Sequence, residues 1–93
     1  MQLTILKKRW RYELVSRVDK EGSRGECDPP DQKNKAIRVL RNLTGEERME
    51  VTIHEQIHAA GWHIDEKFVE QFAADLARNL FKLGFKDGEA NGG

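Results

Sequence analysis

The chain has 93 residues, of which 38% are hydrophobic and 34% charged, and its 16 Lys and Arg balance its 16 Asp and Glu. This length predicts one small domain and excludes multi-domain cofactor enzymes such as a full Rossmann dehydrogenase or a kinase. No apolar run approaches the roughly 18 residues that a membrane span needs, and residues 1–9 do not resemble a secretory signal. With Cys27 as its single cysteine, the sequence predicts a cytoplasmic protein without internal disulfides.

The zero net charge hides an uneven distribution along the chain. Residues 1–44 hold eleven Lys or Arg against six Asp or Glu, whereas residues 45–93 hold five against ten. All three histidines, His54, His58 and His63, lie within ten residues of the acidic half. This histidine cluster is the most informative feature that the overall composition conceals.

Alternating patterns in the basic half predict three strands. Residues 9–18 alternate strictly between two faces, and residues 2–7 and 35–41 show the same period. The short connection between the first two predicts a β-hairpin, although no Gly or Asn marks its turn. Residues 19–34 contain two Gly, two Pro and a single apolar residue, and are predicted to form a loop. We therefore expect a small three-stranded antiparallel sheet.

Two helices are expected to follow in the acidic half. The first is predicted over residues 45–60, where Thr44 and Glu47 fit a capping box. The second is predicted over residues 66–83, with Asp65 as its N-cap and a wide apolar face.

The expected elements fit one domain of the α+β class. Residues 1–86 are predicted to form the sheet and the two helices that follow it, and the polar, Gly-rich residues 87–93 are predicted to form a flexible tail.

The first helix contains the HExxH pattern as His54-Glu55-Gln56-Ile57-His58. His54 and His58 lie one turn apart on the same helix face, so both imidazoles can reach a single zinc ion. Glu55 points about a third of a turn away, where it can accept a proton from a zinc-activated water. The motif therefore predicts one Zn²⁺ per chain, with Glu55 as the general base of a hydrolytic reaction.

A catalytic zinc normally has three protein ligands, so a third is needed. Helix geometry favours Glu66, which occupies the first turn of the second helix, just after the bend expected at Gly61. Glu70 lies one turn further along that helix, and His63 and Asp65 lie in or near the connection. Asp65 also suits the role of an N-cap. At this point all four candidates remain open.

The motif and the residues after it resemble a known class of peptidase. The chain is similar to the short gluzincin-type zinc peptidases of the SprT-like and ImmA/IrrE-like groups, which occur as small phage and bacterial proteins. Members of the latter group follow HExxH with Glu-x-x-Ala-x-x-Phe-Ala-x-x-Leu. The corresponding positions here are Glu66, Val69, Phe72, Ala73 and Leu76, with Val69 in place of Ala.

This resemblance implies a minimal zincin and a zinc metallopeptidase that acts on protein or peptide substrates. It places the third ligand at Glu66. It also implies a small sheet packed on the active-site helix, with an edge strand that can pair with an extended peptide.

Two other features suggest regulation or a different partner. Residues 27–31, Cys-Asp-Pro-Pro-Asp, match the Cys-x-x-Pro-Asp core of the matrixin cysteine switch, in which a thiolate occupies the open zinc position. Arg9, Arg11 and Arg17 share one strand face, which could contact nucleic acid or simply be solvated. The alternative to catalysis is a zinc-stabilised protein- or DNA-binding module, in which the metal pins the two helices together.

Overall fold

The structure, a computed structural model, describes residues 1–85. Its strands are β1 (Gln2–Ile5), β2 (Lys8–Val15), β3 (Gly25–Cys27) and β4 (Ala36–Leu40), and its helices are α1 (Gly45–Ala60) and α2 (Glu66–Lys82). The tail predicted at residues 87–93 lies outside the described residues. Neither of the described helices is long and apolar enough to cross a membrane.

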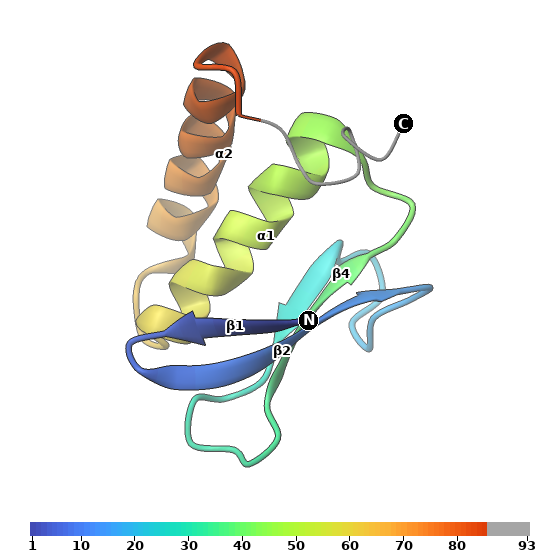
Figure 1. Ribbon diagram of the computed structural model, residues 1–93, viewed down its shortest axis with the longest axis vertical. Helices are drawn as coiled ribbons and strands as arrows, with labels where there is room; N and C mark the ends of the chain where they lie inside the picture. The colour runs from blue at the N-terminus through green and yellow to red at the C-terminus, as the bar shows by residue number, and fades with distance from the viewer. Residues whose placement is uncertain (86–93) are drawn as a thin grey trace.

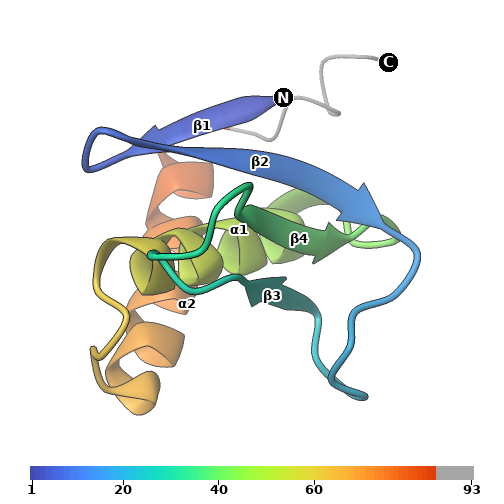
Figure 2. The same ribbon diagram turned by 90° about the horizontal axis from the view of Figure 1, so that it is seen from below.

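The strands form a single mixed sheet with the order β1-β2-β4-β3. β1 pairs with β2 and β3 pairs with β4 in antiparallel fashion, whereas β2 and β4 are parallel. Figure 2 shows the four strands in this order, with β3 at one edge. The prediction of a three-stranded antiparallel sheet is therefore wrong, although the fold belongs to the α+β class.

The missed strand explains both errors in the predicted sheet. β3 has only three residues, Gly25, Glu26 and Cys27, so it is too short to show an alternating apolar pattern. After β2 the chain forms β3 at the far edge and then returns as β4 between them. β3 runs opposite to β2, and β4 runs opposite to β3. β4 therefore runs in the same direction as β2.

The hairpin between β1 and β2 turns through two residues with a left-handed backbone. Leu6 has φ 50° and Lys7 has φ 68°, so neither residue belongs to a strand. The strand predicted at 2–7 therefore ends at Ile5, and the strand predicted at 9–18 covers Lys8–Val15. A tight turn with positive φ at both central positions is the type that matches the twist of a hairpin, and it normally contains Asn or Gly.

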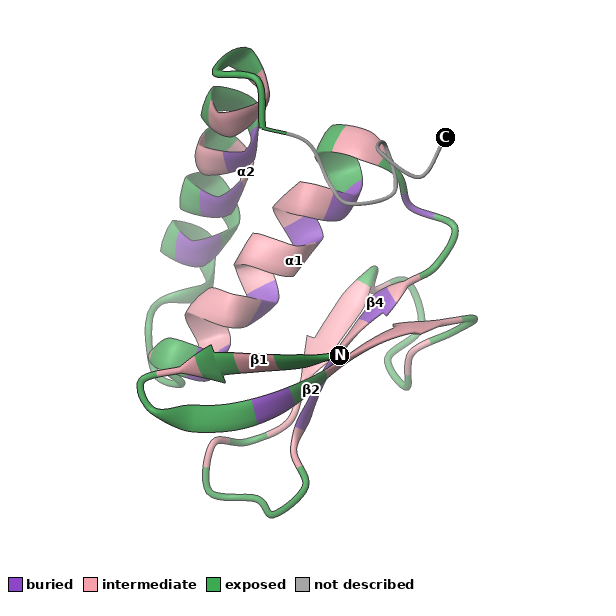
Figure 3. Ribbon diagram, in the orientation of Figure 1, coloured by how far each residue is buried: buried purple, intermediate pink, exposed green. Residues whose placement is uncertain are grey.

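The core lies between the sheet and α1, and α2 packs on α1 (Figures 1 and 3). Its main cluster contains residues from β2, β4, the connection after β4 and α1, namely Trp10, Ile37, Val39, Leu43, Val51 and Ala59. α2 contributes Val69, Ala73 and Ala77, all fully buried. The small side chains allow the two helices to approach closely, which brings residues at the start of α2 near the end of α1.

The two helices begin in different ways. Thr44 makes no side-chain hydrogen bond at the start of α1, and Glu47 pairs instead with Arg24 at 3.1 Å. The expected capping box is therefore not formed; Gly45, with φ 60°, leads into the helix from a left-handed conformation. Asp65 does cap α2, because its Oδ2 accepts a hydrogen bond from the backbone N–H of Phe68 at 3.0 Å.

Candidate metal centre

Side chains from both helices meet at the end of α1. His54 and His58 project from successive turns of that helix. The helix then ends at Gly61, whose N–H donates to the carbonyl of Ile57, and a further bond from Ile64 N–H to the Gly61 carbonyl tightens the connection. This short connection makes Glu66 the first residue of α2 and returns it to the histidines.

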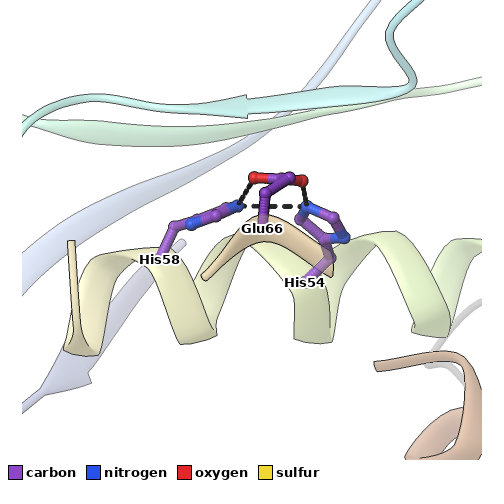
Figure 4. A group of neighbouring side chains, drawn as sticks. All are labelled: His54, His58 and Glu66. Carbon is purple, nitrogen blue, oxygen red and sulfur yellow. Dashed lines mark hydrogen bonds and ion pairs between the residues drawn. The ribbon is translucent and has the colours of Figure 1, made fainter. Parts of the chain in front are cut away.

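The three side chains lie in direct contact (Figure 4). His54 Nε2 lies 3.0 Å from Glu66 Oε1, and His58 Nε2 lies 2.9 Å from Glu66 Oε2. The two Nε2 atoms are 3.1 Å apart. Figure 4 shows the Glu66 carboxylate above the two imidazoles, with an oxygen directed at each ring.

These three side chains form a group that could hold a metal ion, since their ligand atoms lie within 4.8 Å of one another. Ligand atoms bound at about 2.0–2.1 Å to a tetrahedral zinc are about 3.3 Å apart. The three donor atoms would therefore need to move apart only slightly to bind the ion. Imidazole nitrogen and carboxylate oxygen are also donors that zinc accepts. Both the spacing and the donor set therefore fit this ion.

The local environment favours neutral imidazole. Burial, together with the neighbouring His54, lowers the pKa of His58 despite the opposing charge of Glu66. A neutral imidazole can offer a nitrogen lone pair to a metal, whereas a protonated one cannot. The Glu66 side chain is 64% exposed, so the group is open to solvent on its α2 side.

Glu55 lies beside this group and is only 7% exposed. Burial, and then the charges of Glu66 and Glu26, raise the pKa of Glu55 to about 7. The backbone of β3 passes directly over it, because a Cβ on Gly25 would lie 3.2 Å from Glu55 Oε2 and 2.6 Å from Val51 Cγ1. Glycine is therefore needed where β3 crosses α1.

Two hollows meet at this group of side chains and share Glu55, His58 and Glu66. The larger, of about 560 Å³, is otherwise lined mainly by polar residues from the loop before β3 and from the helices, including Lys20, Ser23, Arg24, His54 and Glu70. The smaller, of about 370 Å³, adds Cys27 and Trp62. The two hollows lie towards opposite ends of β3.

The other candidate ligands lie elsewhere. His63 is exposed in the connection, and Asp65 is engaged as the cap of α2. Glu70 lines the larger hollow but lies outside the three-residue group. Cys27 lines the smaller hollow, where its Sγ–H donates to the carbonyl of Asp28 at 3.3 Å.

The resemblance implied an edge strand beside the site, but the sequence did not identify β3 as that strand. Hydrogen bonds join Leu40 N–H to the Arg24 carbonyl and Asp28 N–H to the Ala36 carbonyl, so these positions face β4. In an antiparallel pair the intervening residues point their backbone groups the other way. The N–H and C=O groups of Gly25 and Cys27 therefore face the open side of the sheet. The glycine itself was the available indication, because Gly in an extended segment often marks a close backbone approach.

Comparison with known proteins identifies no relative of this chain. No family model, no curated protein and no solved structure matches the chain. The likeness to SprT-like and ImmA/IrrE-like peptidases stays a prediction from the motif.

Proposed function

We propose that this protein is a zinc-dependent metallopeptidase in which His54, His58 and Glu66 hold the metal. The observation that carries the proposal is the convergence of these three donors from two helices, directly beside the buried carboxylate of Glu55. Two His and one Glu leave a coordination position open, as catalytic zinc sites do. When bound, zinc would polarise the substrate carbonyl and lower the pKa of a water molecule.

Glu55 is the general base of the proposed reaction. It follows His54 in sequence, so it points to the side of the histidine face, towards β3 and away from the ligand positions. There its carboxylate can accept the proton of the attacking water and pass it to the departing amine. A base of this kind contributes typically 10²–10⁴-fold to a rate.

The open edge of β3 supplies the means to hold a peptide. The N–H and C=O groups of Gly25 and Cys27 face away from β4 and can pair with an extended chain, which would then lie over the site as an added strand. A peptide held in this way is fixed by its backbone, so the carbonyl to be cleaved can be positioned beside Glu55. This support is specific to peptide substrates.

The test is to compare the wild type with Glu55→Gln, using Glu46→Gln on the exposed start of α1 as the matched control. Zinc content would be measured by elemental analysis, and cleavage would be followed with a mixture of quenched fluorescent peptides. We expect about one zinc per chain in all three proteins. Cleavage should fall by a factor of about 10² or more in Glu55→Gln alone.

Two results would contradict the proposal. If the wild type bound zinc but cleaved neither peptides nor an unfolded protein, the metal would serve a binding module. If no zinc were bound at all, the proposed ligand set would be wrong.

A further inference from the structure

The smaller hollow differs in chemistry from the larger one. Apart from the three residues that it shares with the metal centre, its lining consists of Cys27 and Trp62. The larger hollow contains the ammonium group of Lys20 and the guanidinium group of Arg24, which pairs with Glu47 and Glu50, both at 3.1 Å. Beyond the residues that the two hollows share, the smaller one therefore offers an indole and a thiol, whereas the larger one offers cations.

Trp62 is held in place although 40% of it is exposed. It directly follows Gly61, which closes α1, and the side chain of Ile64 lies against that glycine. Two backbone hydrogen bonds, those of Gly61 and Ile64, fix the connection on either side of the indole. An exposed tryptophan on such a fixed connection can act as a wall for a ligand at low entropic cost.

The direction of β3 determines which part of a peptide would meet this wall. β3 runs from Gly25, which lies over Val51 and Glu55, to Cys27, which lines the hollow with Trp62. A peptide that pairs with β3 in antiparallel fashion runs the opposite way. Its residues on the N-terminal side of the cleaved bond would therefore lie next to Cys27 and Trp62.

We propose that Trp62 and Cys27 form a specificity subsite for a large apolar side chain on the N-terminal side of the cleaved bond. This inference rests on the proposed function, because it requires an extended peptide on the edge of β3. An aromatic or long aliphatic side chain would cover the indole and the thiol and remove their apolar surface from water. Substrates should thus carry Phe, Leu or a similar residue at that position.

The test measures binding separately from cleavage. Two fluorescein-labelled, amidated octapeptides of Ser and Thr would be used, one with a single Phe at its fourth position and the other with Ala there. Their affinities for zinc-loaded Glu55→Gln protein would be measured by fluorescence anisotropy. We expect the Phe peptide to bind at least about tenfold more tightly, as is typical of a filled apolar subsite.

A pair of variants in the Glu55→Gln background identifies the wall. Trp62→Ala should remove the preference for Phe, whereas Phe68→Ala should keep it. Phe68 is 53% exposed but does not line either hollow. Phe68→Ala therefore removes an exposed aromatic ring away from the proposed subsite and serves as the matched control. Thermal unfolding would verify that both variants are folded.

Intrinsic fluorescence gives a second readout with unlabelled peptide. Trp10 is 1% exposed and Trp62 is 40% exposed, so acrylamide quenching reports mainly on Trp62. The unlabelled Phe peptide should protect this residue from the quencher, and the Ala peptide should protect it much less.

Equal binding of both peptides, binding of neither, or an unchanged preference in Trp62→Ala would overturn the subsite. In the wild type, cleavage after Phe would support it, whereas cleavage before Phe would show that the assigned direction is wrong. Selective binding of the Phe peptide without any cleavage by the wild type would instead contradict the proposed hydrolysis and leave the subsite supported. The two proposals can therefore fail separately.

Discussion

Glu55 is a charged residue on the face of α1 that packs against the sheet, in line with Val51 and Ala59. Burying a carboxylate without a compensating partner costs free energy, and an apolar residue would pack better at this position. Such a conflict with the packing pattern is expected where a residue serves chemistry. The burial of Glu55 therefore indicates a functional role independently of the HExxH pattern.

The chemistry of Cys27 can be predicted from its surroundings. Burial, followed by the charges of Glu55 and Asp28, raises the pKa of the Cys27 thiol to about 12. Because only the thiolate reacts, alkylation by iodoacetamide at pH 8 should be roughly a thousandfold slower in the folded, chelator-treated protein than after unfolding in guanidinium. Intact-mass spectrometry over time checks this. A rate similar to that of the unfolded chain would mean that the thiolate is stabilised at this site, as a cysteine switch requires.

An ion-pair cluster connects the residues of β3 and its end to β4. Asp28 accepts hydrogen bonds from the Ala36 N–H at 2.9 Å and from two nitrogens of Arg38 at 2.9 and 3.1 Å. Glu26 joins the same guanidinium at 3.1 Å. This cluster anchors a strand of only three residues, and that strand covers the site.

The stability of the protein should therefore depend on the ionisation of Asp28. Partial burial acts to raise the pKa of Asp28, but the hydrogen bonds from Arg38 and Ala36 prevail and lower it below 3.8. With a lower pKa in the folded state, the carboxylate stabilises the fold fully above the unfolded pKa and loses this effect as pH falls through the folded value.

Asp28→Asn tests this dependence. The variant should be less stable than the wild type at pH 7, and the difference between them should shrink below about pH 4. Urea unfolding at pH 7, 5 and 3 measures it. A difference that is constant over this range would show that the charge of Asp28 does not contribute.

The hairpin turn offers a way to stabilise the first element pair. Leu6 and Lys7 both have positive φ, a conformation that costs roughly 1–2 kcal/mol for a residue with a Cβ. Leu6→Asn combined with Lys7→Gly should raise the free energy of unfolding by about 1 kcal/mol. Denaturant unfolding measures the change, and Leu6→Ala, which keeps a Cβ in the same conformation, serves as the control. Equal stability of the double variant and Leu6→Ala would contradict this reading of the turn.

How far the sequence predicts each element depends on how distant in sequence the residues are whose contacts form it. The helices at 45–60 and 66–83 were readable because helical periodicity and the Asp65 cap are local features, and they lie at Gly45–Ala60 and Glu66–Lys82. β3 was not readable, since its three residues are held by contacts with β4 and α1 that lie far away in sequence. Strand direction was missed for the same reason.

The candidate site lies where α1, α2 and β3 meet. α1 lies between the sheet and α2 (Figure 1), and it contacts β3 as well as α2. His54 and His58 share a face of α1 for a local reason, whereas the position of Glu66 beside them depends on how α2 packs on α1. Close packing through Ala73 and Ala77 is what brings that first turn within reach.

Because the three donors come from both helices, zinc should stabilise the whole fold. A ligand that binds only the folded state at a hundred times its dissociation constant adds about 2.7 kcal/mol, which corresponds to roughly 10–20 °C in the melting temperature of a domain of this size. Thermal unfolding of the chelator-treated wild type with and without added zinc measures this shift.

The ligand assignment predicts which variants keep the zinc-dependent shift. Glu66→Gln should lose most of it, because an amide is a poorer zinc ligand than a carboxylate. Glu70→Gln, the same change one turn along the same helix, should retain it. A loss in Glu70→Gln with retention in Glu66→Gln would mean that α2 presents its second turn, and not its first, to the metal. The packing of the two helices, rather than the HExxH pattern, would then need revision.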